Sequence, residues 1–358
     1  MTENKYSMQL PDTWDQAKVL KFMKDLADMV TPVTTDFLSK HLAELPPTIA
    51  DPVVYLPTLR ANRGKQRSAL GMLVWMTLSD YRGGPIPTSL LWVLAFIELS
   101  AEATYVLDDI IDNQPRREGV KATHVQFGVN DAWMAGSRQW TLSLLILEQI
   151  DLPEAQKYEL LSLANHMWDI MWEGEARNEH MRLNSTTNYY LERCYQVCAI
   201  MYEAVAHMAA IVAGADDAMI KKAQSVGRHF GMSAMIGNDL LGGFHSGLGG
   251  ISRAQNRQSY EDIRKGIATY PTLTAYASAT PEQRAQLEST LGNPDVTEEQ
   301  LDGFVQLVAD LGGISKTLDL NSHYATKFQE EITRLPDCQA RAGLVAIGNN
   351  LEHVRDYF

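Results

Sequence analysis

The stretch that most constrains this chain is the segment from Leu90 to Asp112, where a long apolar run ends in a cluster of acids. Leucine, isoleucine, valine and alanine dominate its first turns, so the segment predicts a long helix buried in a core. Asp108 and Asp112 stand four residues apart and share one helical face, with Asp109 close beside them. Like charges at that spacing repel each other unless a cation lies between them. The segment therefore predicts a buried helix with a cation site at its C-terminal end.

The residues around these acids indicate which ligand the cation would carry. Carboxylate oxygens suit Mg²⁺, which takes one or two protein carboxylates and completes its shell with phosphate oxygens of a substrate. Arg116 and Arg117 follow at once, and guanidinium groups bind phosphate through paired donors. These residues predict a site for a metal-bridged diphosphate, with Asp108, Asp109 and Asp112 as metal ligands. The alternative is an ordinary acidic helix end at the surface.

On these residues the chain resembles the superfamily of trans-isoprenyl diphosphate synthases and class I terpene synthases. The acidic segment is similar to the first aspartate-rich motif of that superfamily. Gly119, His124, Phe127 and Gly128 follow where the superfamily has Arg-Arg-Gly, His and Phe-Gly. The resemblance implies an all-α isoprenoid-synthase bundle with a central apolar cavity and an allylic isoprenoid diphosphate as substrate. It also implies Mg²⁺ as cofactor, about three ions per site with the diphosphate bound, and a possible homodimer.

The rest of the chain is consistent with an all-α fold, because apolar residues recur at helical spacing and no alternating strand pattern appears. We expect a helix from Val19 that ends at Pro32, and a proline-rich connection over residues 45–57. Long helices with short connections predict a single domain over residues 1–358, with residues 1–12 frayed. Beyond the acidic segment, we expect helices at about 130–150, 153–181, 187–214 and 217–242.

Composition narrows the class of partner and the compartment. The net charge of −13 argues against nucleic acid or an anionic membrane as the main partner. We expect no signal peptide and no membrane span, because the first residues are polar and Glu98 and Glu102 interrupt the best apolar run. Cys194 and Cys198, four apart in a helical segment, predict a buried reduced pair rather than a zinc site. We therefore expect a cytoplasmic protein.

The second metal motif of the superfamily is only partly present. Chain-elongating synthases carry Phe-Gln-x-x-Asp-Asp-x-x-Asp, and here Asn238 and Asp239 stand at the two adjacent acids. The pair is similar to the start of the Asn-Asp-x-x-Ser-x-x-x-Glu motif of cyclases, although Gly242 and Ser246 replace its Ser and Glu. Both side chains offer oxygen to Mg²⁺, so we expect Asn238 and Asp239 to form a second, weakened metal site. The alternative is a polar helix end before a glycine turn.

Other residues that serve chain elongation are also changed. The superfamily's Lys-Thr pair aligns with Val197 and Cys198, and a later lysine aligns with Ile267. Neither the valine nor the isoleucine can hold a diphosphate oxygen. Arg193 lies near the distance from Asn238 at which cyclases carry an arginine that senses the diphosphate. The resemblance therefore suggests Arg193 as a catalytic residue beside Arg116 and Arg117.

Five residues are candidates for substrate binding by the same resemblance. Lys65 and Arg67 belong to a shortened version of the Gly-Lys-x-x-Arg segment that binds the acceptor diphosphate, although the segment can equally be an ordinary loop. Thr104 and Ala103 occupy the positions where the superfamily places the floor of its chain pocket. Both are small, which implies room for a farnesyl or longer tail, unless Tyr105 closes the pocket.

Three functions remain open from the sequence. We favour a Mg²⁺-dependent class I terpene synthase that ionises an allylic diphosphate (farnesyl, geranylgeranyl or longer) and cyclises or rearranges the cation, because cyclisation needs no second diphosphate substrate. The alternative is a trans-prenyltransferase that condenses an allylic diphosphate with isopentenyl diphosphate or another acceptor, which Lys65 and Arg67 favour. The third is a non-catalytic partner subunit of a prenyl synthase, which the damaged second motif fits and the intact first motif does not.

Overall fold

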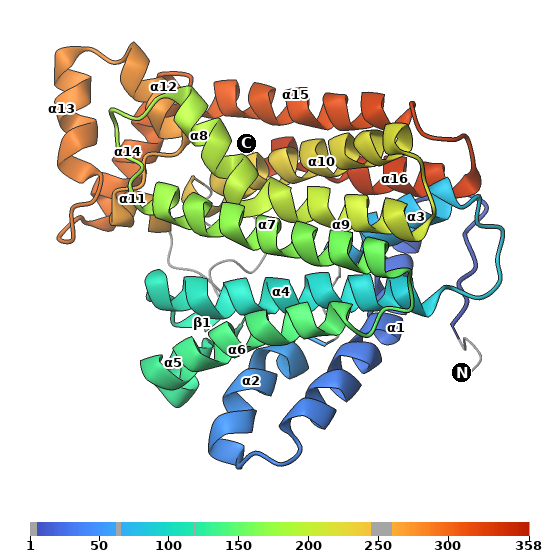
Figure 1. Cartoon of the computed structure of the whole chain (residues 1–358). Helices are drawn as coiled ribbons and strands as arrows, with labels where there is room; N and C mark the ends of the chain where they lie inside the picture. The colour runs from blue at the N-terminus through green and yellow to red at the C-terminus, as the bar shows by residue number, and fades with distance from the viewer. Residues whose placement is uncertain (1–5, 62–65, 118, 245–259, 358) are drawn as a thin grey trace. The chain divides into compact units, whose positions relative to one another are not determined.

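The all-α prediction is confirmed by a computed structural model, which describes residues 6–61, 66–117, 119–244 and 260–357. Lys65 and Ser246 lie outside the described residues. The described part of the chain forms the helices in Figure 1 and a two-stranded ribbon, β1–β2. In chain order the elements are α1 (Gln16–Leu42), α2 (Pro47–Leu59), α3 (Gln66–Leu78), α4 (Thr88–Ile111), β1 (Arg116–Arg117), β2 (Val120–Lys121), α5 (Thr123–Phe127), α6 (Val129–Leu147), α7 (Glu154–Glu179), α8 (Thr187–Cys194), the π-helical turn η1 (Tyr195–Ala199), α9 (Ile200–Val212), α10 (Asp217–Gly243), α11 (Glu261–Lys265), α12 (Tyr270–Ser278), α13 (Pro281–Thr290), α14 (Glu298–Asp310), α15 (Gly313–Ile332), α16 (Gln339–Asn349) and the 3₁₀ turn η3 (Glu352–Tyr357).

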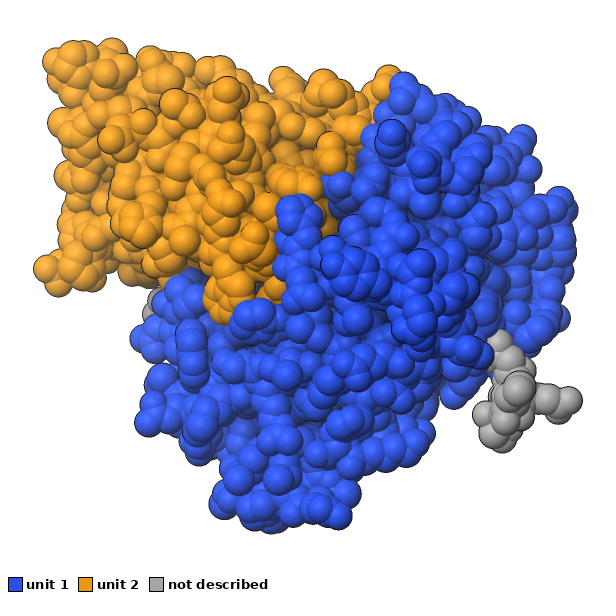
Figure 2. Space-filling view, in the orientation of Figure 1, with its two compact units in different colours: residues 1–166, 201–227, 331–347 blue, residues 167–200, 228–330, 348–358 orange. Residues whose placement is uncertain are grey.

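The chain divides into two compact units, coloured separately in Figure 2. Unit 1 comprises residues 1–166, 201–227 and 331–347, and unit 2 comprises residues 167–200, 228–330 and 348–358. Each unit is assembled from three separate stretches of the chain, so neither corresponds to one half of the sequence. That the whole chain acts as a single domain stays a prediction.

Unit 1 is organised around α4, the helix that ends in the acidic motif. It packs most extensively on α6, which lies alongside it in Figure 1, and also contacts α1, α2 and α3. Close approach to α6 depends on Gly136, because a Cβ added there would lie 2.8 Å from Cγ of Leu107. The buried residues of α4 run almost without interruption from Leu90 to Leu107, so the segment forms a core helix, as its composition predicts.

Unit 2 contains a smaller helical cluster around α12, α13 and α14. Its core includes the buried side chains of Leu287, Leu301 and Phe304. Helices α13 and α14 both begin with a capping box, in which Thr280 and Thr297 each accept a hydrogen bond from the third residue of their helix. These caps explain why two short polar helices have sharp starts.

Two expectations about prolines were wrong. Pro32 does not end the first helix, because α1 continues to Leu42, and the proline-rich connection is largely the helix α2. An interior proline costs a helix about 3 kcal/mol. In α1 the buried residues before and after Pro32, such as Val30 and Phe37, offset that cost, since each buried large apolar side chain contributes about 1.5–3 kcal/mol.

The N-terminal stretch also differs from expectation over its described part. Residues 6–12 are not frayed, because Ser7 forms a β-bridge with Pro85 and Met8 is buried. The hydroxyl of Tyr81 accepts from the amide of Met8 at 3.1 Å and donates to the carbonyl of Met8 at 3.0 Å. Tertiary hydrogen bonds therefore hold a stretch whose own composition is polar and irregular.

Two helical stretches, Thr88–Ile111 and Thr187–Val212, are long and apolar enough to cross a membrane by length and composition alone. The first does so although Glu98 and Glu102 lie within it. In both, 83% of the most apolar window is buried inside the structure, which is typical of core helices, so the two are weak evidence for a membrane span.

Candidate functional site

The acidic motif lies at the end of α4 in unit 1, and its three aspartates face different surroundings. Asp108 is partly exposed, with 28% of its side chain accessible, and Asp112 is half-buried. The amide of Asp112 still donates to the carbonyl of Asp108 at 2.8 Å, so the two share one helical face, as predicted. Asp109, by contrast, is fully buried.

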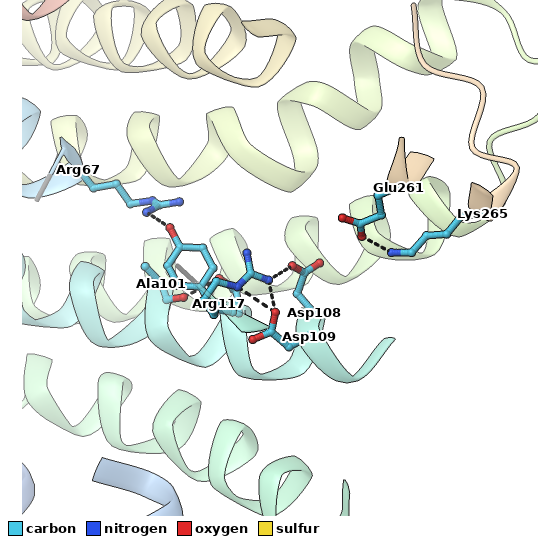
Figure 3. Close-up of polar contacts among 9 residues, drawn as sticks. Arg67, Ala101, Asp108, Asp109, Arg117, Glu261 and Lys265 are labelled. Atoms are coloured by element: carbon cyan, nitrogen blue, oxygen red, sulfur yellow. Dashed lines mark hydrogen bonds and ion pairs between the residues drawn. The ribbon is translucent and has the colours of Figure 1, made fainter. Parts of the chain in front are cut away.

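The buried Asp109 binds Arg117, the second arginine of the motif (Figure 3). Nε and Nη2 of Arg117 donate to Oδ1 of Asp109 at 2.9 and 2.5 Å, and Nη2 also donates to Oδ2 of Asp108 at 2.7 Å. Burial alone would lower the pKa of the Arg117 guanidinium, but the two carboxylates outweigh it and raise that pKa above its ordinary value. The arginine is therefore permanently charged and fixed against the acids.

The ribbon β1–β2 brings Arg117 back to the helix from which the chain has just emerged. Arg117 pairs with Val120 across the ribbon, and Gly119 between them has φ of 87°, a left-handed conformation that favours glycine. Side chains alternate along a strand, so Arg117 is buried while its neighbour Arg116 is exposed. Arg116 donates to the carbonyl of Gly119 at 3.0 Å and thereby closes the turn. Its role in binding diphosphate stays a prediction.

The geometry of these acids bears on the predicted metal site. Among the described residues, no three Asp, Glu, His or Cys side chains are close enough to form a metal site. Asp108 and Asp112, two accessible carboxylates on one face, fit the one or two protein ligands that Mg²⁺ takes when a substrate phosphate supplies the others. Asp109 instead holds Arg117, so its own role as a metal ligand stays a prediction.

Tyr105, one turn before Asp108, is surrounded by three arginines. The guanidinium carbon lies 4.6 Å from the ring centroid for Arg60, 5.0 Å for Arg117 and 5.7 Å for Arg67. Nη1 of Arg67 also donates to the Tyr105 hydroxyl at 3.0 Å. Tyr105 therefore belongs to a charged cluster and contacts the residues predicted to bind diphosphate.

Sequence reasoning missed Arg60 and Glu102, which complete this cluster. Both are buried, and Nε of Arg60 lies 3.1 Å from the Glu102 carboxylate. A buried acid needs a cationic partner, so Glu102 inside an apolar helix was the signal that an arginine would reach it.

The positions predicted to form the floor of a chain pocket are small side chains, as the sequence implies. Ala103 is buried, and the hydroxyl of the half-buried Thr104 donates to the carbonyl of Ala101 in the same helix at 2.8 Å. The depth of a chain pocket, like the predicted central apolar cavity, stays a prediction.

In unit 2 the second motif is arranged differently from the prediction. Asp239 is only 3% exposed, and both of its oxygens accept hydrogen bonds from protein donors. Nη1 of Arg193 donates to Oδ1 and Oδ2 at 3.0 and 2.8 Å, and the Tyr190 hydroxyl donates to Oδ2 at 2.7 Å. Asn238, the residue before Asp239 on α10, is exposed. The two residues therefore do not present a shared set of oxygens in this structure, and their role as metal ligands stays a prediction.

Arg193, predicted to sense the diphosphate, is also buried and paired within the protein. It is 5% exposed, and its Nε donates to Oδ1 of Asn178 at 2.9 Å in addition to its bonds to Asp239. Burial would lower the pKa of the Arg193 guanidinium, but Asp239 outweighs it and raises that pKa. Arg193 and Asp239 thus form an internal ion pair in this structure, and their catalytic and metal-binding roles stay predictions.

The neighbouring cysteines behave as predicted. Cys194 and Cys198 are buried and form no disulfide. Burial, followed by the nearby Asp239, raises the pKa of the Cys194 thiol to about 12. The thiol is therefore an inert core side chain.

Comparison with known proteins identifies what this chain is similar to. The family model described as polyprenyl synthetase matches residues 52–308. A geranylgeranyl diphosphate synthase of Saccharolobus solfataricus is 26% identical over 268 residues, which cover 74% of this chain and 79% of that protein. A geranylfarnesyl diphosphate synthase of Natronomonas pharaonis is 28% identical over 280 residues, covering 76% and 79%.

Solved structures agree on the fold. A geranylgeranyl pyrophosphate synthetase from Pyrococcus horikoshii superposes with a TM-score of 0.82 at 20% identity, covering 94% of this chain and 98% of that one. A polyprenyl synthase from Caulobacter crescentus, complexed with calcium and isoprenyl diphosphate, superposes with a TM-score of 0.80 at 21% identity, covering 95% and 98%. The resemblance inferred from the acidic motif is thereby confirmed.

Proposed function

Because this chain belongs to the polyprenyl synthetase family, we propose that it is a Mg²⁺-dependent trans-prenyltransferase that condenses an allylic isoprenoid diphosphate with isopentenyl diphosphate. The observation that carries the proposal is the contact of Arg117 with Asp108 at the end of α4, with Asp112 on the same helical face as Asp108. Two accessible carboxylates suit a divalent cation, and a fixed guanidinium beside them suits the diphosphate that the cation would bridge.

The favoured expectation from the sequence, a cyclising terpene synthase, is not supported. The relatives named above are prenyl diphosphate synthases, which agrees with the alternative of a prenyltransferase. The cyclase interpretation depended mainly on the changed elongation residues, and Arg193 and Asn238 with Asp239 were its further support. Arg193 and Asp239 bind each other in the core of unit 2, and Asn238 is exposed apart from them.

The reaction needs a leaving group to be stabilised and a cation to be kept from water. A bound Mg²⁺ would neutralise the charge that develops on the departing diphosphate, and Asp108 and Asp112 are the residues that would hold it. Arg117 would bind a diphosphate oxygen through Nη1, because its contacts among the described residues use only Nε and Nη2. Asp109 holds that guanidinium in place before substrate arrives, so little reorganisation is needed on binding.

The test is incubation with geranyl, farnesyl and geranylgeranyl diphosphates, each with and without isopentenyl diphosphate and Mg²⁺. We expect a longer diphosphate only when both substrates and the metal are present. A hydrocarbon or alcohol formed from one allylic substrate would instead support the cyclase, and no product in any mixture would support a non-catalytic subunit.

Variants at the acids separate a chemical role from a structural one. Asp108→Ala should abolish condensation while the protein keeps its helical circular dichroism, because its partly exposed carboxylate is assigned to the metal. Asp131→Ala on α6 is the matched control, since that exposed acid lies outside the cluster. Undiminished product formation by Asp108→Ala would contradict the assignment.

A further inference from the structure

Tyr105 occupies a position on α4 from which it contacts both groups of predicted diphosphate ligands. Its ring stacks near Arg117, which is bound to the acidic motif, and its hydroxyl accepts a hydrogen bond from Arg67, which belongs to the predicted acceptor segment. Tyr105 precedes Asp108 by three residues, so the two lie on neighbouring turns of one face. Tyr105 therefore contacts both Arg117, which is predicted to bind the allylic diphosphate, and Arg67, which is predicted to bind the acceptor diphosphate.

The ring of Tyr105 is held in place from several sides. It packs against the apolar cluster of Leu56, Val106 and Ala132. Arg60, which lies 4.6 Å from its centroid, is itself buried and paired with Glu102. Because an aromatic ring has only two rotatable side-chain bonds, these contacts leave the hydroxyl as an acceptor at a fixed position.

The residue that follows Arg67 is also held in place. The next residue, Ser68, donates to Oε1 of Glu98 from its hydroxyl at 2.5 Å and from its amide at 3.3 Å. Glu98 and Tyr105 both belong to α4, so this helix holds the start of α3 at one point and the Arg67 side chain at another. The Arg67 guanidinium also lies 5.4 Å from the ring centroid of Tyr202. Arg67 is therefore oriented by contacts that exist before any substrate binds.

From these contacts we propose that Tyr105 is a positioning residue for the acceptor substrate, orienting Arg67 through its hydroxyl so that the guanidinium binds the diphosphate of isopentenyl diphosphate. The proposal rests on the proposed function. A guanidinium that is already oriented loses less freedom when it binds a phosphate, so the hydroxyl contributes to acceptor affinity without touching the acceptor. Arg117 is held by Asp108 and Asp109 independently of that hydroxyl, so the allylic substrate should not sense its loss.

The test is Tyr105→Phe, which removes the hydroxyl and keeps the ring. Isothermal titration of the full chain with isopentenyl diphosphate should show a Kd raised about three- to tenfold, the range expected for the net contribution of one ordinary hydrogen bond. In steady-state assays the KM for isopentenyl diphosphate should rise by a similar factor, while the KM for farnesyl diphosphate with Mg²⁺ stays within about twofold. Tyr158→Phe, at a residue that is 76% exposed on α7, is the matched control.

A double-mutant cycle shows whether Tyr105 acts through Arg67. If it does, Tyr105→Phe combined with Arg67→Met should bind isopentenyl diphosphate no more weakly than Arg67→Met alone. Additive losses, an unchanged Kd in Tyr105→Phe, or equal losses for both substrates would overturn the proposal, and so would a wild-type protein that does not bind isopentenyl diphosphate. If the wild type binds it with the expected dependence on Tyr105 but forms no longer diphosphate, the proposed function fails and the positioning role stands.

Discussion

Replacing Asp239 by asparagine distinguishes an internal ion pair from a metal ligand. Asp239 accepts from Arg193 at 2.8 and 3.0 Å and from Tyr190 at 2.7 Å, and all three side chains are buried. Asparagine keeps the size of the side chain but removes its charge, so Arg193 remains buried without the carboxylate that neutralises it.

The size of the effect follows from that buried charge. Removing one partner of a buried ion pair costs about 3–5 kcal/mol, because the other charge stays in the low-dielectric interior. The entropy of unfolding is about 2.1 cal/mol/K per residue, so the 358 residues give about 0.75 kcal/mol/K for a chain that unfolds in one transition. Asp239→Asn should therefore lower the Tm by about 4–7 °C.

The assay is differential scanning calorimetry in the presence of a chelator and without substrate. If Asp239 were a metal ligand, its replacement would raise the Tm in the presence of a chelator, because removing one of several clustered carboxylates relieves their repulsion. Asn238→Ala, at the exposed neighbouring position, is the control and should leave the Tm unchanged. A Tm for Asp239→Asn equal to or above that of the wild type would refute the reasoning.

Three further predictions follow from the described contacts. Gly136→Ala should destabilise the protein by about 1–3 kcal/mol in urea denaturation, because the new methyl group would lie 2.8 Å from Cγ of Leu107; wild-type stability would show that α4 and α6 can separate. Cys194 should resist iodoacetamide in the native protein from pH 7 to pH 9 while the half-exposed Cys338 reacts, as read by mass spectrometry, because burial raises the pKa of the Cys194 thiol to about 12. Between pH 9.0, the ordinary thiol pKa, and about pH 12, the Cys194 thiol ionises in the unfolded state but not in the folded state. The contribution of Cys194 to the free energy of unfolding therefore falls as pH rises through this range. Arg117→Lys should reduce kcat/KM for the allylic substrate at least about tenfold, since lysine lacks the fork that binds the acids and a phosphate oxygen together; a change within twofold would argue against that role.

Sequence patterns predicted the features of this chain that depend on residues close together in the sequence. The buried helix before Asp108 follows from its apolar composition, and the shared face of Asp108 and Asp112 follows from helical spacing. The helices expected from apolar periodicity between residues 130 and 242 correspond to α6 through α10. The π-helical turn Tyr195–Ala199 inside that stretch has no counterpart in the periodicity.

The features that local patterns did not show depend on tertiary contacts. Pro32 is tolerated within α1 because residues on both sides of it are buried, which the local rule for proline does not include. Arg193 and Asp239 are 46 residues apart, and the motifs assign the first to the diphosphate and the second to the metal. Nothing local shows that the two charges satisfy each other in the core of unit 2.

One pattern in α4 carried more information than the acidic motif alone. Five polar residues recur along the helix at spacings of four, three, four and three, which places them on one face: Glu98, Glu102, Tyr105, Asp109 and Asp112. Burying acids in an apolar helix is unfavourable unless hydrogen-bond donors or cations reach them. In the structure the first, second and fourth of these residues bind Ser68, Arg60 and Arg117, and Tyr105 binds Arg67. Arg60 and Arg117 are thus required by the burial of Glu102 and Asp109, so the stability of a variant that lacks either arginine should be measured before its activity is interpreted.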